Sequence, residues 1–259
     1  MTMGKLTIVG LGPGSTLQQT PEVTRALESA DVLHGYAPYL ARVPHRAGQR
    51  RQASDNREEL VRAQAALLDT ASGLRAVVVS GGDAGVYGMA AAVCEALEHG
   101  PTQWRELDVE ILPGITAMLA VAARVGAPLG HDFCAISLSD NLKPWEVIEA
   151  RLRAAATARF VIALYNPVSR HRPWQLSRAL TLLTEHLDAA RTPVILGRAV
   201  SRPTESVQVT TLANVDCSAA DMSTCIIVGS EHTRLIERSG STPLVYTPRS
   251  LPSSNAVTK

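Results

Sequence analysis

The stretch "LTIVGLGPGS", Leu6–Ser15, decides the first part of the fold. An apolar run typical of a buried strand ends at Gly10, and two more glycines follow at Gly12 and Gly14. The spacing is not the dinucleotide fingerprint G-x-G-x-x-G, because Pro13 removes an amide donor, and no Lys-Ser/Thr pair follows as in a P-loop. The stretch predicts either an ordinary tight turn or a backbone wall beside a flat, uncharged part of a ligand, such as an adenine.

The rest of the first half alternates strand-like and helix-like segments. Residues 20–30 are expected to form a helix, with Thr20 as its cap and Pro21 at its first position. Further strands are expected at 31–36, 75–83 and 108–116, and further helices at 56–72, 89–99 and 116–126. This rhythm predicts a mostly parallel sheet covered on both faces.

The second half continues the alternation and then changes character. Strands are expected at 133–139, 159–167 and 192–200, and helices at 144–157 and 173–187. Shorter strands at 205–212, 224–230 and 242–249 follow closely on one another, which favours antiparallel pairing. The chain is therefore predicted to be an α/β protein of two domains, 1–125 and 126–249, with mostly parallel or mixed sheets, a cleft between them and a flexible tail at 250–259.

Composition excludes several functional classes. The 259 residues carry a formal net charge of +1 and a mean hydropathy of +0.05, so overall charge gives no reason to expect nucleic acid or a membrane surface as partner. Apolar stretches are far shorter than the ~20 residues of a membrane span, and no signal peptide is expected. The four cysteines show no metal-binding spacing and predict buried free thiols in a cytoplasmic protein without a metal site.

Two further glycine turns follow expected strands. "VVVSGGDAGVYGMA", residues 77–90, places Gly81, Gly82 and Asp83 where a strand ends. Ligands of open α/β sheets gather at that edge, although Asp83 could instead be a helix cap. "LPGITAML", residues 112–119, begins its helix with small side chains that allow close approach of a ligand or of another helix.

Taken together, the segments "VGLGPGS", "SGGDAGVYG" and "LPGITA" resemble those of the tetrapyrrole methylase family. These enzymes use S-adenosylmethionine (SAM) to methylate corrin precursors and uroporphyrinogen. The resemblance covers roughly residues 4–249. The segments "HGYAPYL", "SLSDNLKPWEVIEARL", "LYNPVSRHRPWQL" and "GRAVSRPTE" resemble the branch that methylates carbon 17 of precorrin-3B and contracts the ring to precorrin-4, in cobalamin biosynthesis.

The resemblance implies a cofactor site in which SAM is held largely by main-chain groups and leaves as S-adenosylhomocysteine. Its residues are Pro13, Gly81, Gly82, Asp83, Val86, Thr116, Ala117, Asn166, Ala199, Val200 and Thr224. Asn166 departs from relatives that often have methionine at this position. The family also implies a homodimer.

The substrate carries many carboxylates, as the family implies, and guanidinium groups bind carboxylates well. Residues expected to contact it are Tyr36, Arg170, Arg172, Arg198 and Arg202. The basic segment "RVPHRAGQRR", residues 42–51, could contribute too, although a solvated basic loop is the favoured interpretation. Ring contraction needs a base, and the candidates that stay open are His34, Asp83, His171 and Asp140.

Other functions remain in competition with this one. The closest is a sister enzyme that acts on cobalt-factor III or on another ring carbon. A second, of a different class, is a non-catalytic tetrapyrrole- or nucleotide-binding protein. A nucleic-acid methyltransferase is disfavoured, because no extended basic and aromatic face is visible in the sequence.

Overall fold

The computed structural model describes residues 4–250, so the tail predicted at 250–259 lies almost wholly outside the described residues. The chain divides into two compact units, Met1–Ala117 (unit 1) and Met118–Lys259 (unit 2). The division falls after the first residue of helix α5 (Ala117–Val125) and not after its end. Two contacts explain why α5 groups with unit 2: Val121 packs against Gly197, and Arg124 forms an ion pair with Glu205.

Unit 1 is built on one parallel sheet with the strand order β3-β2-β4-β1-β5. This confirms the α/β class and the parallel pairing predicted for the first half. The strands are β1 (Lys5–Gly10), β2 (Val32–Tyr36), β3 (Arg50–Ser54), β4 (Arg75–Ser80) and β5 (Asp108–Leu112). The helices are α1 (Pro21–Ser29), α2 (Ala37–Leu40), α3 (Glu59–Ala71) and α4 (Met89–His99), with 3-10 turns η1 (Thr16–Gln18) and η2 (Thr102–Glu106).

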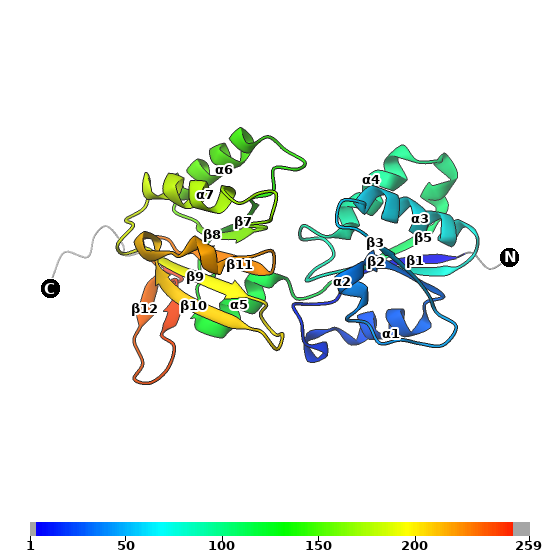
Figure 1. The fold of residues 1–259 in the computed structure, drawn as a ribbon, viewed down its shortest axis with the longest axis horizontal. Coiled ribbons are helices and arrows are strands. Elements are labelled where there is room, and N and C mark those ends of the chain that lie inside the picture. The colour runs from blue at the N-terminus through cyan, green and yellow to red at the C-terminus, as the bar shows by residue number, and fades with distance from the viewer. Residues whose placement is uncertain (1–3, 251–259) are drawn as a thin grey trace. The chain divides into compact units, whose positions relative to one another are not determined.

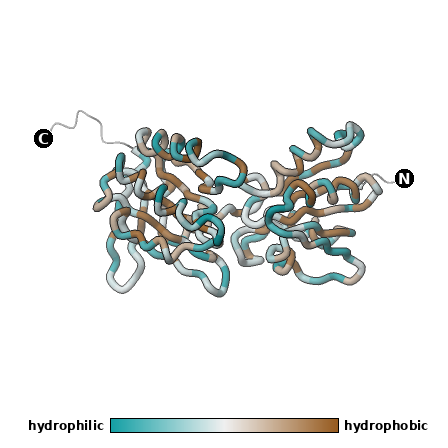
Figure 2. The backbone as a smooth tube through the Cα atoms, turned by 45° about the horizontal axis from the view of Figure 1, so that its top comes forward, coloured by the Kyte–Doolittle hydropathy of each residue, from teal (hydrophilic) through white to brown (hydrophobic). Residues whose placement is uncertain are grey.

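The strands of unit 1 are buried on both faces, and alternate residues serve two separate cores. In β4, Ala76 and Val78 belong to the core under α3 and α4, whereas Val77 and Val79 belong to the core under α1 and α2. Figure 1 shows these helix pairs on opposite sides of the sheet, and Figure 2 shows the strands between them as apolar tube. This period of two is what a doubly covered sheet requires.

The cap predicted for α1 is confirmed. Thr20 precedes the helix in an extended conformation, and its Oγ1 accepts a hydrogen bond from the amide of Val23 at 3.2 Å. Pro21 occupies the first position, where its missing N–H costs nothing. The edge strand β3 was missed, because the sequence from Arg50 to Ser54 is polar and contains a basic pair.

Unit 2 contains a five-stranded mixed sheet of order β10-β9-β11-β8-β7 and a small three-stranded sheet of order β12-β13-β6. The strands are β6 (Gly126–Ala127), β7 (Phe133–Ser137), β8 (Val161–Tyr165), β9 (Pro193–Arg198), β10 (Ser206–Thr211), β11 (Thr224–Val228), β12 (Arg234–Ile236) and β13 (Leu244–Tyr246). Besides α5, the helices are α6 (Trp145–Thr157) and α7 (Gln175–Thr184), with 3-10 turns η3 (Leu212–Asn214) and η4 (Cys217–Ala219).

Antiparallel pairing enters the larger sheet of unit 2 through its later strands, as predicted. β10 and β11 each pair antiparallel with β9, and β11 also pairs antiparallel with β8. Helices α6 and α7 cover one face of this sheet and bury Leu152, Leu176 and Leu183 there. On the other face, an added Cβ at Gly197 would lie 2.8 Å from Val121 Cγ1, so β9 packs directly against α5.

Candidate functional site

The three glycine turns predicted from the sequence meet at the carboxyl edge of the unit 1 sheet. They follow β1, β4 and β5, and β1 lies between the other two strands. Backbone hydrogen bonds join the first two turns: the amide of Leu11 donates to the carbonyl of Ser80 at 2.9 Å, while Gly12 and Gly82 exchange bonds of 3.0 and 3.1 Å. The "GPG" turn is therefore one wall of a joined backbone structure and not an isolated loop.

Glycine is required in these turns for close approach. A Cβ at Gly10 would lie 2.6 Å from the carbonyl oxygen of Gly82 and 2.8 Å from the amide nitrogen of Gly114. A Cβ at Gly114 would lie 2.5 Å from the oxygen of Gly10 and closer still to that of Gly82. Gly82 also has a φ of 63°, which favours glycine. Any side chain at Gly10 or Gly114 would force the three turns apart.

Asp83 holds the second and third turns together. Its Oδ1 accepts from the amides of Gly85 at 2.8 Å and Val86 at 3.1 Å, and its Oδ2 accepts from the amide of Gly114 at 2.9 Å. It is not the cap of α4, because that helix begins only at Met89. Both carboxylate oxygens are occupied, so Asp83 is placed to position backbone groups, and this geometry argues against a role as a free base.

The other predicted cofactor residues of unit 1 line the same three turns. Pro13 and Thr116 are buried, whereas Gly81, Val86 and Ala117 are partly exposed. A Cβ at Gly82 would approach the backbone of Thr116 and Ala117 at 3.7 and 3.9 Å, so these turns are neighbours in space. What they offer to a ligand is backbone and small apolar surface.

His34 lies away from these turns, inside unit 1. It is only 1% exposed, and its Nε2 is 2.8 Å from Asp69 Oδ2 on α3. Burial lowers the pKa of His34 against the opposing effect of Asp69. The candidate base His34 is thus corrected to a residue of the unit 1 interior, because no substrate can reach a ring so enclosed. Tyr36 ends the same strand, half-buried, with its ring edge-on to Tyr39 at 5.5 Å.

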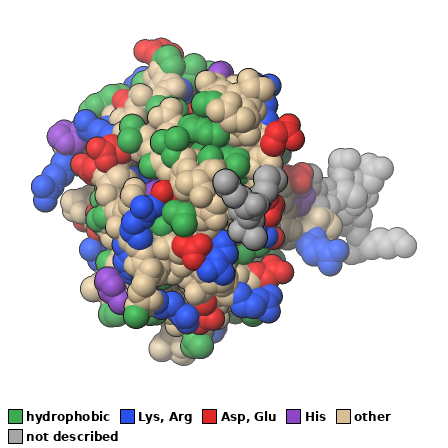
Figure 3. Space-filling model, turned by 90° about the vertical axis from the view of Figure 1, so that its right-hand side faces the viewer, with side chains coloured by type: hydrophobic (Ala, Val, Ile, Leu, Met, Phe, Trp, Pro, Cys, Tyr) green, Lys and Arg blue, Asp and Glu red, His purple; other side chains and the backbone are tan. Residues whose placement is uncertain are grey.

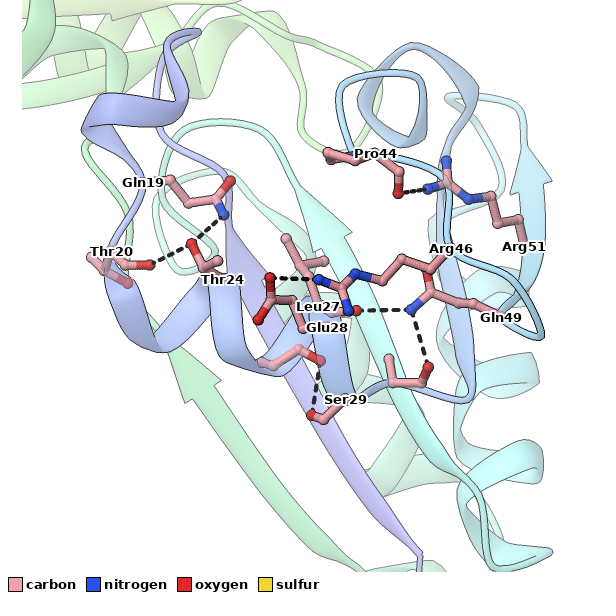
Figure 4. Close-up of polar contacts among 12 residues, drawn as sticks. Gln19, Thr20, Thr24, Leu27, Glu28, Ser29, Pro44, Arg46, Gln49 and Arg51 are labelled. Atoms are coloured by element: carbon pink, nitrogen blue, oxygen red, sulfur yellow. Dashed lines mark hydrogen bonds and ion pairs between the residues drawn. The ribbon is translucent and has the colours of Figure 1, made fainter.

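The basic segment 42–51 is exposed at Arg46 and Arg50, as a solvated loop would be, but Arg42 and Arg51 are bound to backbone. Arg42 donates to the carbonyl of Gly12 at 2.9 Å, and so supports the "GPG" turn from behind. Arg51 donates to the carbonyls of Leu40 at 3.0 Å and of Val43 at 2.8 Å. Arg46 differs, because it forms an ion pair with the Glu28 carboxylate at 2.5 Å, which Figure 4 shows. The local sequence gives no sign of the bonds made by Arg42 and Arg51, because their acceptors are backbone carbonyls.

In unit 2, Asn166 directly follows β8 with a left-handed φ of 51°. Its Nδ2 donates to Ser137 Oγ at 3.0 Å, which joins the carboxyl ends of β8 and β7. Arg172, predicted to bind a substrate carboxylate, is only 6% exposed, and its Nη1 donates to the carbonyl of Asn166 at 3.1 Å. That prediction is corrected, because the guanidinium is turned inward and occupied by backbone.

The neighbours of Arg172 behave differently. Arg170 and His171 are exposed at the tip of a tight turn closed by reciprocal backbone bonds between Ser169 and Arg172. Asp140, another candidate base, accepts from Gln175 Nε2 at 3.0 Å. Of the four candidate bases, His171 is the exposed one, and within residues 4–250 its ring takes part in no hydrogen bond.

A second group of predicted residues gathers at the end of β9. Ala199 and Val200 are buried, and Ala199 has a φ of 48°. Arg198 forms an ion pair with Asp221 at 2.7 Å, and Asp221 Oδ1 also accepts from Thr224 Oγ1 at 3.1 Å. Arg202 is partly exposed in the turn that follows. The Arg198 guanidinium therefore stabilises the segment from Asp221 to Thr224, where β11 begins.

The cysteines of residues 4–250 differ in burial and form no metal site there. The prediction of buried thiols is right for Cys225 alone, whose pKa burial raises to about 12, while Cys94 is exposed. Across residues 4–250 no group of three metal-ligating side chains is found, and no helix there is long and apolar enough to cross a membrane. On the face shown in Figure 3, basic and acidic side chains intermingle.

Comparison with known proteins identifies the family. The family model described as Tetrapyrrole (Corrin/Porphyrin) Methylases matches residues 5–216. This chain belongs to the tetrapyrrole methylase family. Among its relatives, a precorrin-3B C(17)-methyltransferase of Sinorhizobium sp is 60% identical, with 95% of this chain and 96% of the relative covered.

Two more tetrapyrrole methylases place the chain within the family. A probable cobalt-factor III C(17)-methyltransferase of Salmonella typhimurium is 40% identical, with 93% of this chain and 99% of that protein covered. The crystal structure of the methyltransferase CobJ matches with a TM-score of 0.89 and 49% identity, over 95% of this chain and all of that one. The fold class and the family predicted from the glycine turns are thereby confirmed.

Tetrapyrrole methylases are SAM-dependent, and the turns of unit 1 fit this donor chemically. An adenosine group is large and uncharged, and the turns present peptide groups and small apolar side chains with close packing behind them. Asp83 is the charged residue in these turns, and backbone amides already bind both of its carboxylate oxygens. The predicted cofactor residues of unit 1 all lie on these turns or directly beside them: Pro13, Gly81, Gly82, Asp83, Val86, Thr116 and Ala117.

Proposed function

We propose that this protein transfers the methyl group of SAM to carbon 17 of precorrin-3B and contracts the macrocycle to precorrin-4, in cobalamin biosynthesis. The observation that carries the proposal is 60% identity to a precorrin-3B C(17)-methyltransferase across nearly the full length of both proteins. The joined glycine turns of unit 1 supply a suitable place for the donor. We further propose a cytoplasmic homodimer with no nucleic-acid or membrane partner.

The division of labour among the residues follows from their surroundings. SAM, when bound, supplies a methyl group already activated by a positive sulfur. The chain's own task is then alignment and exclusion of water, which can be worth several kcal/mol, roughly 7–11 at the extreme. We propose that the unit 1 turns align the donor, with Asp83 acting through the backbone it holds. In unit 2 we propose cofactor contacts at Asn166, Ala199, Val200 and Thr224.

Substrate binding is assigned to groups that the structure leaves accessible. Arg170 is exposed and Arg202 partly exposed, and guanidinium forks match carboxylates. Tyr36, half-buried at the end of β2, is proposed to pack its ring against the macrocycle. We assign Arg198 a smaller role in substrate binding, because its guanidinium already forms an ion pair with Asp221.

Ring contraction requires loss of a hydroxyl proton as the bridging carbon becomes a ketone. His171 is the proposed base, because its ring is exposed whereas Asp83, His34 and Asp140 are engaged in hydrogen bonds. An imidazole is suited to proton transfer near neutral pH. We expect His171→Gln to lower kcat while leaving SAM affinity unchanged.

The sister reaction is the competing proposal. The relative named for cobalt-factor III is 40% identical, against 60% for the relative named for precorrin-3B, which favours the metal-free substrate. The deciding experiment incubates the pure protein with SAM and either precorrin-3B or cobalt-factor III. A mass gain of one methyl on precorrin-3B supports the proposal. Conversion of the cobalt compound alone would favour the sister enzyme, and binding without turnover would favour a carrier.

A further inference from the structure

Three consecutive residues after β8 have contrasting surroundings. The backbone bonds between Ser169 and Arg172, 3.1 and 3.0 Å long, close a tight turn. Arg170 and His171 are exposed at the tip of this turn, whereas the side chain of Arg172 is directed into unit 2 and is 6% exposed. The turn therefore fixes where the Arg172 guanidinium enters the protein.

The guanidinium of Arg172 is bound by backbone oxygens and a thioether. Its Nη1 donates to the carbonyls of Asn166 at 3.1 Å and Leu138 at 3.4 Å, and its Nη2 lies 3.9 Å from Met222 Sδ. Within residues 4–250 it forms no ion pair with a carboxylate. Burial lowers the pKa of Arg172, and Asp140 opposes this only from beyond ion-pair distance, so the direct partners of the guanidinium are the two carbonyls.

The acceptor Asn166 has an unusual backbone. Its φ of 51° lies in the left-handed region, which most residues with a Cβ avoid, although asparagine adopts it more readily than the others. Its side chain is held by Ser137 Oγ, but its carbonyl is held by Arg172. The Ser137 bond orients the Asn166 side chain, and the Arg172 bond orients the peptide group that follows Asn166.

We propose that Arg172 is a positioning residue: its guanidinium holds Asn166 in the left-handed conformation and thereby fixes the surface that Asn166 offers to SAM. The inference rests on the proposed function, in which Asn166 contacts SAM. It places Arg172 behind the cofactor surface and not in contact with a substrate carboxylate.

The test uses the demethylated product, S-adenosylhomocysteine, as probe in calorimetric titrations of the full-length protein. Arg172→Met keeps an unbranched apolar stem but removes the donors, and we expect its dissociation constant for S-adenosylhomocysteine to rise at least about tenfold, the factor that loss of one charge-assisted hydrogen bond implies. Asn166→Gly removes the penalty on the left-handed backbone. In that background Arg172→Met should therefore have a much smaller effect, about threefold or less.

The same titrations separate positioning from plain stabilisation. Arg178→Met, on the exposed face of α7, breaks an ion pair with Glu149 and should leave the affinity unchanged. Thermal unfolding of each variant is measured in parallel. A lowered melting temperature of Arg172→Met with unaltered affinity would overturn the inference, as would an equal loss of affinity in the Asn166→Gly background.

Two further outcomes are also decisive. If Arg172→Met does not fold, Arg172→Lys takes its place, because lysine retains the charge and can reach one carbonyl; it should show the same rescue by Asn166→Gly with a smaller factor. Failure of the unaltered protein to bind S-adenosylhomocysteine would instead overturn the proposed function, and the inference with it.

Discussion

Asp83 Oδ2 lies 2.9 Å from the amide nitrogen of Gly114, although the two residues are 31 positions apart in the sequence. Through this bond one carboxylate joins the turn after β4 to the turn after β5. Its other oxygen orders its own turn through the amides of Gly85 and Val86. The conformation of two of the three glycine turns thus depends on a single side chain.

Removing this carboxylate should damage both stability and cofactor binding. Asp83→Ala loses three hydrogen bonds to a charged acceptor, a kind of bond that contributes up to about 3 kcal/mol. Because such contributions are not additive and water can reach the freed amides, we expect a net loss of roughly 2–4 kcal/mol in the free energy of unfolding. Asp83→Asn should lose less, because one oxygen acceptor remains. SAM affinity, measured by calorimetry, should fall more in Asp83→Ala than in Asp140→Ala. The reverse order would mean that the donor does not bind at these turns.

Gly114 should tolerate no side chain. Its added Cβ would lie 2.5 Å from the oxygen of Gly10, and all nearby atoms are backbone, so no side chain can move aside. We expect Gly114→Ala to destabilise the protein by about 3 kcal/mol or more and to abolish SAM binding. Gly48→Ala is the matched control: Gly48 has a φ of 78° but nothing within 4 Å of the added Cβ. It should cost only about 1 kcal/mol, without effect on SAM binding.

His34 should make stability fall with acidity. Because burial lowers the pKa of His34, the unfolded chain binds a proton below about pH 6.5 that the folded protein does not take up. The free energy of unfolding therefore decreases as pH falls from that value toward the folded pKa. Asp69, Arg50 and Arg62 are the charged groups around the ring, and the two arginines also disfavour the imidazolium.

The measurement for His34 is urea unfolding at pH 7.5 and pH 5.5. His34→Gln can still donate to Asp69 but cannot titrate. Stability of the unaltered protein relative to His34→Gln should decline between the two pH values. A constant difference would show that His34 has the same pKa in both states.

Arg170 should act on substrate alone. Arg170→Ala removes an exposed guanidinium, and we expect KM for the tetrapyrrole to rise about three- to tenfold, with SAM affinity unchanged. Arg191→Ala, which removes another exposed arginine from the turn before β9, should change neither value. A change in SAM affinity without a change in KM would contradict the assignment of Arg170 to the substrate.

A stability prediction concerns the end of α6. Arg159 follows the C-cap Ala158 with a φ of 64°, the position at which helices favour glycine. Arg159→Gly and Arg159→Ala both lose the ion pair with Glu231, but only glycine relieves the backbone. We expect Arg159→Gly to exceed Arg159→Ala in stability by about 1 kcal/mol, measured by urea unfolding. Equal stabilities would mean that this turn relaxes freely.

The sequence alone determined the alternation of strands and helices, the cap at Thr20 and the three glycine turns. These are local properties: a period of two, a capping hydroxyl and residues without a side chain can all be read within a few positions. Family membership followed from the same turns, because their composition reflects a backbone that must approach other backbone closely. The edge strand β3 was missed for the converse reason, since its residues are polar and only their partner β2 makes them a strand.

Tertiary structure alone decided which polar side chains are accessible. His34, Arg172 and Arg42 looked available in the sequence, yet each is bound to an atom at least six positions away. Arg170 and His171, which directly precede Arg172, remain exposed. The physical reason is that a long polar side chain can extend to water or turn inward to a carbonyl with nearly equal ease. Only the completed packing of the neighbouring strands and loops determines which of the two has the lower free energy.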